Sequence, residues 1–387
     1  MGINRPSSRI KHRLAGPTSL IARFADFAAD PRRLAEKILI LAKYPFATGR
    51  AYLSYWRSFT RTNASFVLER WNGAVELSSA TKIAVFSHFD AQGMVHDFVA
   101  HYLQQLSEAG FTVIFVSNAP RLAEETVSRL RPYCGLILRR ANVGYDFGAY
   151  KDGISQIPDL GSIENLLLAN DSVYGPFQPL EGIVARMDQS ADVWGITDSW
   201  VRHHHLQSYF LLFNRAALQS ASFSRFWSRF RYVNSKRFII SAGEFGLSRE
   251  LDAGGLRCQA LFPYRTIVNE LLPVVLNAKS AHYEALDPGS RVFIRRIAFA
   301  LRHGRSVNSM HFFWDYLITR RGCPFLKREL LRDNPERAPF IREWAKVVGS
   351  SSAYDTSFIA RHLELTMPNR PLRDPVPSGR PYRAWFP

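Results

Sequence analysis

The amino-acid sequence predicts an α/β protein in which a mostly parallel sheet is flanked by helices. From Lys82 onward, short apolar runs of strand length alternate with segments of helical periodicity, and glycine or small polar residues separate them. This alternation is typical of βαβ units, whose strands lie parallel and whose helices cover both faces of the sheet. With 387 residues, of which 47% are hydrophobic, the chain is long enough to bury a substantial core.

The apolar pattern predicts each element in turn. Residues 18–72 carry apolar side chains at helical spacing, with Arg and Lys between them, and predict helices. Strands are predicted at six apolar runs, residues 83–86, 112–116, 135–138, 166–169, 192–196 and 209–213. Further helices are predicted at residues 95–109, 123–131, 182–187, 223–230, 244–251, 311–319 and 325–331. We therefore expect a basic helical N-terminal extension over residues 1–80, a core over 81–285, and a helical C-terminal extension over 286–387 with a Pro- and Arg-rich tail.

The net charge of +17 at pH 7 predicts an anionic partner, which is nucleic acid, an acidic membrane surface or a phosphorylated substrate. Residues 1–72 hold 13 Lys and Arg against 4 Asp and Glu, and a second basic run comprises Arg291, Arg295, Arg296, Arg302 and Arg305. No nucleic-acid recognition motif occurs, and the basic residues lie apart from the aromatic runs, so nucleic acid is not the expected partner. The N-terminal extension either lies on an anionic membrane or packs on the core with its charges solvated.

These features predict a cytoplasmic protein that is peripheral on the inner face of the cell membrane. The basic N-terminus is not followed by an apolar region with a cleavage site, and no stretch reaches 18 apolar residues. The three cysteines, Cys134, Cys258 and Cys323, are far apart and have no metal-ligand spacing, which fits a reducing compartment.

The segment over residues 142–179 carries the strongest signal for function. It reads NVGYDFGAYKDG at 142–153 and, after a short gap, LLLANDSVYGPF at 166–177. The run 166–169 suits a buried strand, and open α/β sheets bind ligands at the carboxyl ends of their strands. Asp171 follows such a strand, where a carboxylate can hold Mg²⁺ or Mn²⁺ on a diphosphate because hard cations prefer oxygen ligands. The alternative is a carboxylate that caps the turn after the strand.

Five segments in order resemble the rhamnan synthesis protein F family of bacterial polysaccharide glycosyltransferases. They read NVGYDFGAYKDG (142–153), LLLANDSVYGPF (166–177), DVWGITDS (192–199), HLQSYFLLF (205–213) and PFLKRELLRDNP (324–335). The resemblance spans residues 82–335, and a looser likeness reaches the family 2 glycosyltransferases with the Rossmann-type GT-A fold. It implies inverting transfer of a deoxysugar, from dTDP-L-rhamnose or a related nucleotide-sugar. The implied acceptor is a lipid-linked or polymeric glycan of the cell surface, such as lipopolysaccharide O-antigen.

The resemblance also implies roles for individual residues. Asn170-Asp171-Ser172 stands where the looser family has Asp-x-Asp, so Asp171 is the expected metal ligand, and a metal-free site with basic residues on the diphosphate stays open. Glu244 is the expected base that deprotonates the acceptor hydroxyl, with Asp198 as its rival. Donor contacts are expected from polar and glycine residues at the strand ends and the Gly-rich loop: Ser87, His88, Asp90, Ser117, Asn118, Asn142, Gly144, Tyr145, Asp146 and Asn170.

The remaining candidates bind the acceptor or its phosphate groups. The three consecutive histidines at 203–205 cannot share one face of a strand, so a zinc site is not expected there. His205 and Gln207 are two residues apart, which points both into one acceptor cleft if they lie on a strand. Lys327 and Arg332 are expected to meet phosphate groups, unless they lie on a solvated helix face. A non-catalytic glycan-binding or scaffold subunit on the same fold is the alternative to an enzyme.

Overall fold

The computed structural model describes residues 66–277 and 281–386, together with four isolated residues before them, Gly49, Leu53, Trp56 and Ser58. All elements below belong to one compact unit, Arg57–Pro387. The helices predicted before residue 66, and the membrane-binding role predicted for the N-terminal extension, lie outside the described residues. No helix among the described residues is both long and apolar enough to cross a membrane.

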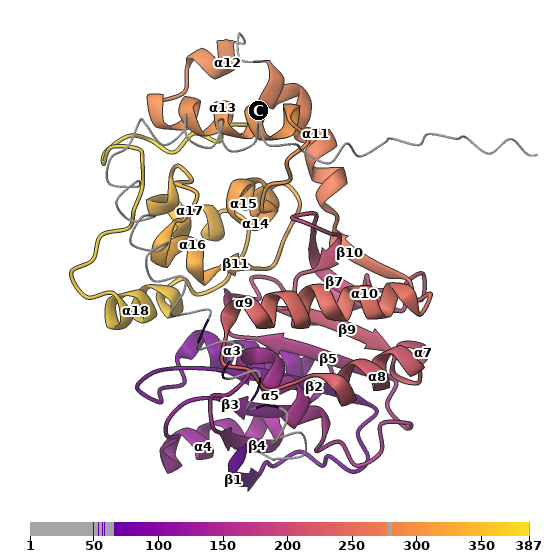
Figure 1. Ribbon diagram of the computed structural model, residues 1–387. Coiled ribbons are helices and arrows are strands. Elements are labelled where there is room, and N and C mark those ends of the chain that lie inside the picture. The colour runs from indigo at the N-terminus through magenta and orange to yellow at the C-terminus, as the bar shows by residue number, and fades with distance from the viewer. Residues whose placement is uncertain are drawn as a thin grey trace, which may run out of the picture. The chain divides into compact units, whose positions relative to one another are not determined.

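A nine-stranded, mostly parallel sheet forms the centre of this unit (Figure 1). Its strands are β1 (Val67–Asn72), β2 (Lys82–His88), β3 (Thr112–Ser117), β4 (Cys134–Arg140), β5 (Asn165–Asn170), β7 (Val193–Ser199), β8 (His205–Leu206), β9 (Phe210–Asn214) and β10 (Cys258–Phe262). The strand order is β1-β4-β3-β2-β5-β9-β7-β10, and β8 pairs with β7. Strands β4, β3, β2 and β5 are mutually parallel, as are β7 and β10, whereas β9 and β1 run antiparallel to their neighbours. The predicted α/β class is therefore confirmed.

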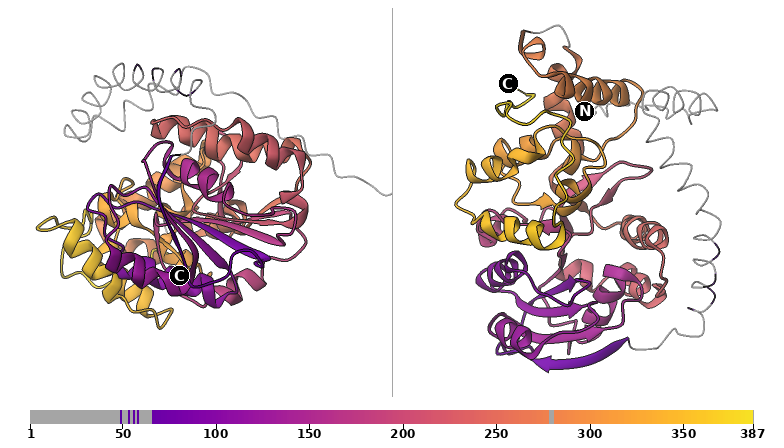
Figure 2. Two further views of the ribbon diagram at one scale, coloured as in Figure 1. Left: turned by 90° about the horizontal axis from the view of Figure 1, so that it is seen from below. Right: turned by 90° about the vertical axis from the view of Figure 1, so that its left-hand side faces the viewer.

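Helices cover both faces of the sheet because its strands are apolar on both sides (Figure 2). Alternate residues of β2 belong to different cores: Ala84 and Phe86 pack with α3 (Asp97–Glu108), while Ile83 and Val85 pack with α5 (Tyr145–Ile154). The first core also includes α4 (Glu124–Leu130) and α6 (Leu180–Ala185). The second includes α7 (Arg215–Leu218), α8 (Ala221–Arg229) and α10 (Phe245–Ala253). These helices fix the strand ends at which the site is built.

The C-terminal part is helical, and one short strand returns it to the sheet-bearing part. Its helices are α11 (Tyr264–Leu276), α12 (Ala281–Glu284), α13 (Pro288–Arg302), α14 (Ser309–Phe312), α15 (Trp314–Thr319), α16 (Arg328–Asp333), α17 (Trp344–Gly349) and α18 (Ser357–Thr366). Strand β11 (Leu326–Lys327) pairs antiparallel with β6 (Val173–Tyr174), which directly follows the predicted Asn-Asp-Ser triplet. This pairing brings Lys327 and its neighbour Arg328 to the carboxyl end of β5.

Two sequence-based predictions of helix were wrong. Residues 67–72 form the edge strand β1, because β4 supplies hydrogen-bond partners and Glu69 lies opposite Arg139, whose guanidinium it pairs with at 2.6 Å. Residues 326–327, predicted as helix, form β11, and helix α16 begins only at Arg328. In both places a distant strand decides the local conformation, which periodicity within the segment does not reveal.

Candidate active site

Three of the predicted donor-binding residues form one hydrogen-bonded cluster at the carboxyl ends of β2 and β5. Ser87 Oγ donates to Asp146 Oδ1 at 3.0 Å, and Asn170 Nδ2 donates to Asp146 Oδ2 at 3.3 Å. Asp146 lies in the first turn of α5, where a carboxylate is favoured by the helix dipole. Burial, together with the nearby charge of Asp171, raises the pKa of Asp146 to about 6. The cluster thus holds a carboxylate that is ionised at neutral pH.

Asp171 is paired with an arginine that the sequence analysis did not single out. Nη1 of Arg328 donates to Asp171 Oδ2 at 2.8 Å and to the main-chain oxygen of the same residue at 2.7 Å. The main-chain N–H of Phe89 also points at Asp171 Oδ2, at 3.4 Å. Arg332, the predicted residue one turn further along α16, instead forms an exposed ion pair with Asp333 at 2.6 Å. The only sequence signal for Arg328 is its place beside Lys327 in the PFLKRELLRDNP segment.

Lys327 brings a second positive charge to the same cluster. Its ammonium lies 4.0 Å from the centre of the Tyr209 ring. Burial lowers the pKa of Lys327 to about 8, although the charges of Glu244, Glu329 and Asp146 act in the opposite direction. Lys327 therefore remains mostly protonated at neutral pH. It lies near Glu244, because Tyr209, whose ring it contacts, directly follows Ser208, which donates a hydrogen bond to Glu244.

The carboxylates of this cluster do not by themselves make a metal site. Among the residues that the structure describes, no group of three or more His, Cys, Asp or Glu side chains is placed to hold an ion. Asp171 is already engaged by the Arg328 guanidinium, and Asp146 by two neutral donors. The Mg²⁺ or Mn²⁺ expected at Asp171 stays a prediction.

The predicted base and the two predicted acceptor residues line one cavity of about 490 Å³. Glu244, His205 and Gln207 contribute from the sheet-bearing part, and Asn308 and Glu336 from the C-terminal helical part. Glu244 ends a π-helical turn, Ile239–Glu244, and accepts hydrogen bonds from Ser208 Oγ at 2.5 Å and from Ser208 N at 3.4 Å. The cavity joins the core and the C-terminal helices, so both contribute to whatever binds there.

His205 lines this cavity and has one unprotonated ring nitrogen. Its Nδ1 lies 2.9 Å from the main-chain oxygen of His203, and a carbonyl can only accept, so Nδ1 carries the proton. Burial lowers the pKa of His205, which keeps the ring neutral and leaves Nε2 as an acceptor. Gln207 Oε1 accepts from Thr197 Oγ1 at 2.6 Å, which leaves its amide N–H groups as donors.

Asp198, the rival candidate for the base, has both carboxylate oxygens engaged by groups of the protein itself. Its Oδ1 accepts from the main-chain N–H of Tyr264, the first residue of α11, at 2.6 Å. Its Oδ2 lies 3.1 Å from Trp200 Nε1 and 3.2 Å from His204 Nε2. With both oxygens engaged and only 5% of the residue exposed, Asp198 is less suited than Glu244 to take a proton from a substrate.

Several other predicted donor contacts build the loops around the cluster. His88 lies 3.1 Å from Ser117 Oγ and 3.1 Å from the main-chain oxygen of Met94, so both of its ring nitrogens have partners. Asp90 Oδ1 accepts the N–H groups of Gln92 and Met94 and so folds its own loop. Their direct contact with a donor stays a prediction.

A buried arginine, Arg140, holds the loop before α5 in place. Arg140 donates to Asp152 Oδ2 at 2.6 Å, to Asn118 Oδ1 at 2.5 Å and to the main-chain oxygen of Val143 at 2.9 Å. Gly144 has a left-handed backbone (φ 84°), and its N–H donates to Asn234 Oδ1 at 3.1 Å. The anchor fixes the start of α5 and hence the position of Asp146.

Two aromatic side chains remain exposed around the cluster. Tyr145 follows Gly144 with φ 52°, a strained conformation for a residue with a side chain, and is 40% exposed. Phe89, whose N–H faces Asp171, is 42% exposed and was not singled out from the sequence. Asn142 is also exposed. These rings are available to stack on a planar ligand.

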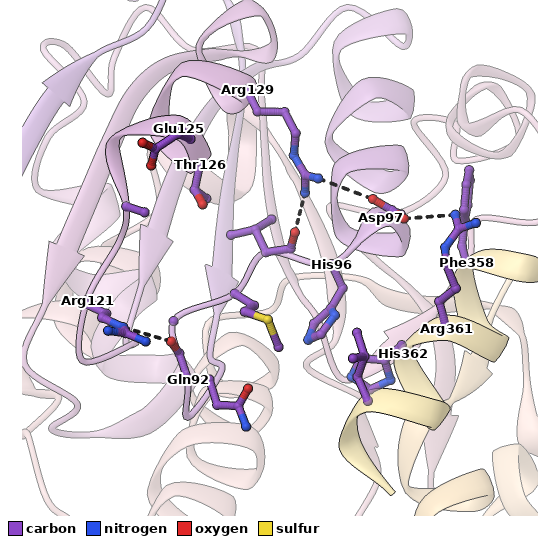
Figure 3. Close-up of a pocket in the computed structure, with 15 residues that line it drawn as sticks. Gln92, His96, Asp97, Arg121, Glu125, Thr126, Arg129, Phe358, Arg361 and His362 are labelled. Carbon is purple, nitrogen blue, oxygen red and sulfur yellow. Dashed lines mark hydrogen bonds and ion pairs between the residues drawn. The ribbon is translucent and has the colours of Figure 1, made fainter. Parts of the chain in front are cut away.

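A second cavity, of about 640 Å³, lies where the loop before α3 meets α18 (Figure 3). Asp97 is held there between Arg129 at 3.3 Å and Arg361 at 2.9 Å. The rings of His96 and His362 meet edge to face, with centroids 4.5 Å apart. His362 Nε2 lies 3.3 Å from Nη2 of Arg328, so this cavity wall also supports the arginine that pairs with Asp171. None of the predicted site residues lines this cavity.

Comparisons with known proteins agree with the resemblance seen in the sequence. Residues 113–284 match the family described as rhamnan synthesis protein F. The virulence protein VirA of Vibrio anguillarum is 31% identical over 276 residues, which make up 70% of this chain and 86% of that protein. The chain belongs to the rhamnan synthesis protein F family.

A second relative is an uncharacterized protein, y4gN, of Sinorhizobium fredii. It is 32% identical over 166 residues, or 41% of this chain and 43% of that protein. Membership of the rhamnan synthesis protein F family indicates a glycosyltransferase-like role in rhamnan or polysaccharide biosynthesis. The family match includes Asp146, Asn170, Asp171 and the base candidate Glu244, but it begins after Ser87 and ends before Lys327 and Arg328.

Proposed function

We propose that this protein is an inverting glycosyltransferase that moves a sugar from a nucleotide diphosphate to a glycan acceptor. The observation that carries the proposal is the meeting of two subsites. A charged cluster at the carboxyl ends of β2 and β5 contains Asp146, Asp171 and Lys327, and the cavity beside it contains Glu244. Lys327 contacts the ring of Tyr209, and the preceding residue, Ser208, donates a hydrogen bond to Glu244, so donor and acceptor would meet at this point.

In the proposed reaction, Glu244 acts as the general base. Its carboxylate takes the proton from an acceptor hydroxyl, and the freed oxygen attacks the anomeric carbon of the donor sugar from the face opposite the diphosphate. The bond between that carbon and the diphosphate oxygen breaks, and its electron pair leaves with the nucleotide. Ser208 supports this role, because its hydrogen bonds hold the Glu244 carboxylate in one orientation.

The departing diphosphate gains negative charge, which Lys327 and Arg328 are suited to stabilise. Arg328 is held by Asp171 and Lys327 by Tyr209, so both cations are positioned before the substrate binds. Asp171 then acts as the residue that orients Arg328. The predicted divalent cation is not required in this scheme, because the two side chains provide the positive charge that it would supply.

We further propose that the donor is dTDP-L-rhamnose or a related deoxysugar nucleotide, and that the acceptor is a lipid-linked or growing polysaccharide at the membrane's inner face. Support comes from the family, whose description names rhamnan synthesis. The exposed rings of Tyr145 and Phe89 flank the strand-end cluster and would stack on the nucleotide base. The mixed carboxylate and amide lining of the cavity beside Glu244 suits the hydroxyl groups of a sugar acceptor.

A thermal-shift screen tests this proposal. The folded protein is heated with dTDP-, UDP- and GDP-sugars, each with Mg²⁺, with Mn²⁺ and with a chelator. A ligand that binds only the folded state raises the apparent melting temperature by mass action, so one nucleotide class should give a shift. Absence of a shift with every nucleotide, in a well-folded sample, contradicts the proposal and favours a non-catalytic scaffold.

A further inference from the structure

Helix α13 (Pro288–Arg302) has an outward face that combines arginines with exposed apolar side chains. Val292, Arg295, Phe299 and Arg302 recur at intervals of three or four residues, which places them on one face of the helix. Val292 is 50% exposed and Phe299 is 40% exposed, although both are apolar. The opposite face is buried through Phe293, Ile294 and Ile297. The exposed apolar residues are therefore not needed to pack the helix against the protein.

The charge of this face is of one sign. Residues 288–314 contain five arginines and no Asp or Glu. Arg296 turns inward and pairs with Glu336 at 3.2 Å. Arg295, Arg302 and Arg305 form no ion pair with the described part of the chain, and the Arg305 guanidinium lies 5.9 Å from the centre of the Phe299 ring. This segment thus carries three exposed guanidinium groups without an ion pair among the described residues, and one of them, that of Arg305, lies beside the exposed Phe299 ring.

We propose that this outward face of α13 docks on an anionic phospholipid surface. A helix that carries arginines beside exposed aromatic and aliphatic side chains suits the membrane interface, where the apolar groups enter the acyl boundary and the guanidinium groups meet lipid phosphates. Charge complementarity selects anionic lipid over neutral lipid. The exposed apolar residues favour lipid over nucleic acid, since a phosphate backbone offers nothing for Val292 to contact.

The position of α13 relates this face to the candidate acceptor cavity. Ser306, Val307 and Asn308, which follow α13 in the chain, line the cavity that contains Glu244. Glu336, the partner of Arg296 on the inner side of α13, lines it as well. Helix α13 lies at the end of the unit remote from β1 (Figures 1 and 2). Docking through α13 would therefore bring the cavity close to the membrane, as a lipid-linked acceptor requires, although the docking itself does not rest on the proposed transfer reaction.

Vesicle co-sedimentation of the full chain tests the inference. The probe is phosphatidylcholine vesicles with and without phosphatidylglycerol. Wild-type protein should bind the anionic vesicles preferentially. In the variant R295Q/R302Q the partition coefficient should fall roughly 25-fold, because each arginine near an anionic surface contributes about a fivefold factor. The matched control R229Q/R380Q removes the same charge from two exposed positions outside α13 and should bind like wild type.

A second variant separates interfacial docking from simple charge attraction. Phe299→Ser removes the exposed ring without changing charge, and binding to anionic vesicles should fall severalfold. The inference is overturned if R295Q/R302Q binds as well as wild type, if both double variants weaken binding equally, or if Phe299→Ser has no effect. All these side chains are exposed, so a thermal melt should confirm that each variant is folded. Nucleotide-sugar thermal shifts on the same samples report on the proposed transferase separately.

Discussion

Lys327 and Asp146 are a pair of opposite charges whose pKa values are shifted toward each other. Burial raises the pKa of Asp146 to about 6 and lowers that of Lys327 to about 8. Both side chains are therefore ionised in the interval between these values and lose their charge on opposite sides of it. Groups with such shifts concentrate at functional sites, because the burial that perturbs them also strengthens their interaction with a ligand.

The shifted pKa of Lys327 predicts a pH-dependent affinity for nucleotide diphosphates. Below about pH 8 the ammonium is charged and attracts the diphosphate, and as pH rises through that value the charge is lost, so the dissociation constant should increase. In Lys327→Arg the guanidinium stays charged at all these pH values, and the increase should disappear. Titration calorimetry with dTDP on both sides of pH 8 measures this. Equal pH profiles for the two proteins would argue against a contact between Lys327 and the diphosphate.

The buried charge of Asp146 is expected to lower the free energy of unfolding of the protein. Because its folded-state pKa is raised from 3.8 to about 6, the folded state is favoured at low pH, and that advantage is lost as pH rises through about 6. Asp146→Asn retains an oxygen that can accept from Ser87 and should raise the free energy of unfolding above pH 6 by about 1–3 kcal/mol. The gain should shrink as pH falls from 6 toward 3.8.

Denaturant unfolding at two pH values checks this prediction. The control Glu181→Gln removes an exposed carboxylate from α6 and should leave stability nearly unchanged at both. If Asp146→Asn destabilises the protein above pH 6, the Asp146 carboxylate is stabilised by its surroundings instead of strained by burial.

Glu244 is expected to contribute to the rate of transfer more than to folding. In Glu244→Gln the side-chain oxygen can still accept from Ser208, but the amide cannot take a proton, so kcat should fall by about 10²–10⁴-fold. Glu250→Gln, on the helix that follows, removes a carboxylate whose partner is Arg225 and should keep wild-type activity. Initial rates with a nucleotide-sugar and a glycan acceptor measure the difference. An unchanged kcat in Glu244→Gln would exclude this residue as the base.

At the scale of secondary-structure elements, short pieces of chain from distant regions complete the site. Strand β11 has two residues, yet its pairing with β6 fixes where Lys327 and Arg328 lie relative to Asp171. The π-helical turn Ile239–Glu244 similarly ends with Glu244 in contact with Ser208, in the segment between β8 and β9. Such irregular turns are frequent at functional sites, because they direct a side chain where a regular helix would not.

Arg140 connects β4, α5 and the loop between them, and its substitution should strongly destabilise the folded protein. The guanidinium is fully buried and pairs with Asp152, which also accepts a hydrogen bond from the Tyr232 hydroxyl. Arg140→Met would leave the Asp152 charge buried without its partner and should lower the free energy of unfolding by about 3–5 kcal/mol. Arg139→Met, at the adjacent position, breaks the pair with the partly exposed Glu69 and a hydrogen bond to the main-chain oxygen of Pro120, and should cost about 1 kcal/mol.

Chemical denaturation of these two variants provides the measurement. Nucleotide binding by Arg140→Met under stabilising conditions should also weaken, because the loop that positions Asp146 loses its anchor at Val143. Equal losses of stability in the two variants would mean that the buried network around Arg140 contributes no more than a surface ion pair.

At the scale of the whole molecule, the sheet and the C-terminal helices share one hydrophobic core. Phe86 and Phe115 of the sheet belong to the same buried cluster as Phe293, Trp314 and Ile359 of the C-terminal helices. The predicted boundary near residue 286 thus does not separate two cores within the described residues. Residues from both sides of that boundary line the cavity with Glu244.

A shared core predicts cooperative unfolding of residues 66–277 and 281–386. Hydrogen exchange under mild denaturant should give the same opening free energy for the buried amides of β2, β3 and α15, because they unfold together. Lower protection confined to the C-terminal helices would indicate that they open as a separate unit. In that case nucleotide binding should be lost before the sheet unfolds, since Lys327 and Arg328 come from that part of the chain.

Six strands of the sheet and the positions of their ends follow from the amino-acid sequence. Apolar periodicity is local, so β2, β3, β4, β5, β7 and β9 were each predicted close to their observed limits, and Ser87, Asn170 and Asp171 were correctly placed at their carboxyl ends. Sequence spacing also indicated that His205 and Gln207 would point the same way, and both line one cavity.

Which charged side chains contact one another depends on the packing of distant elements. Asp171 and its partner Arg328 are 157 residues apart, and Ser87 and Asp146 are 59 apart, so no local pattern links them. The same holds for Asp198, the rival of Glu244 for the role of base. Its carboxylate accepts a hydrogen bond from the main-chain N–H of Tyr264, which is distant in the sequence. Arg328, which the sequence analysis did not single out, reaches Asp171 because β11 pairs with β6. The hydrophobic pattern determines where helices and strands form, because it depends on residues close together in the chain. Ion pairs and cavities depend instead on how elements distant in the chain pack against one another.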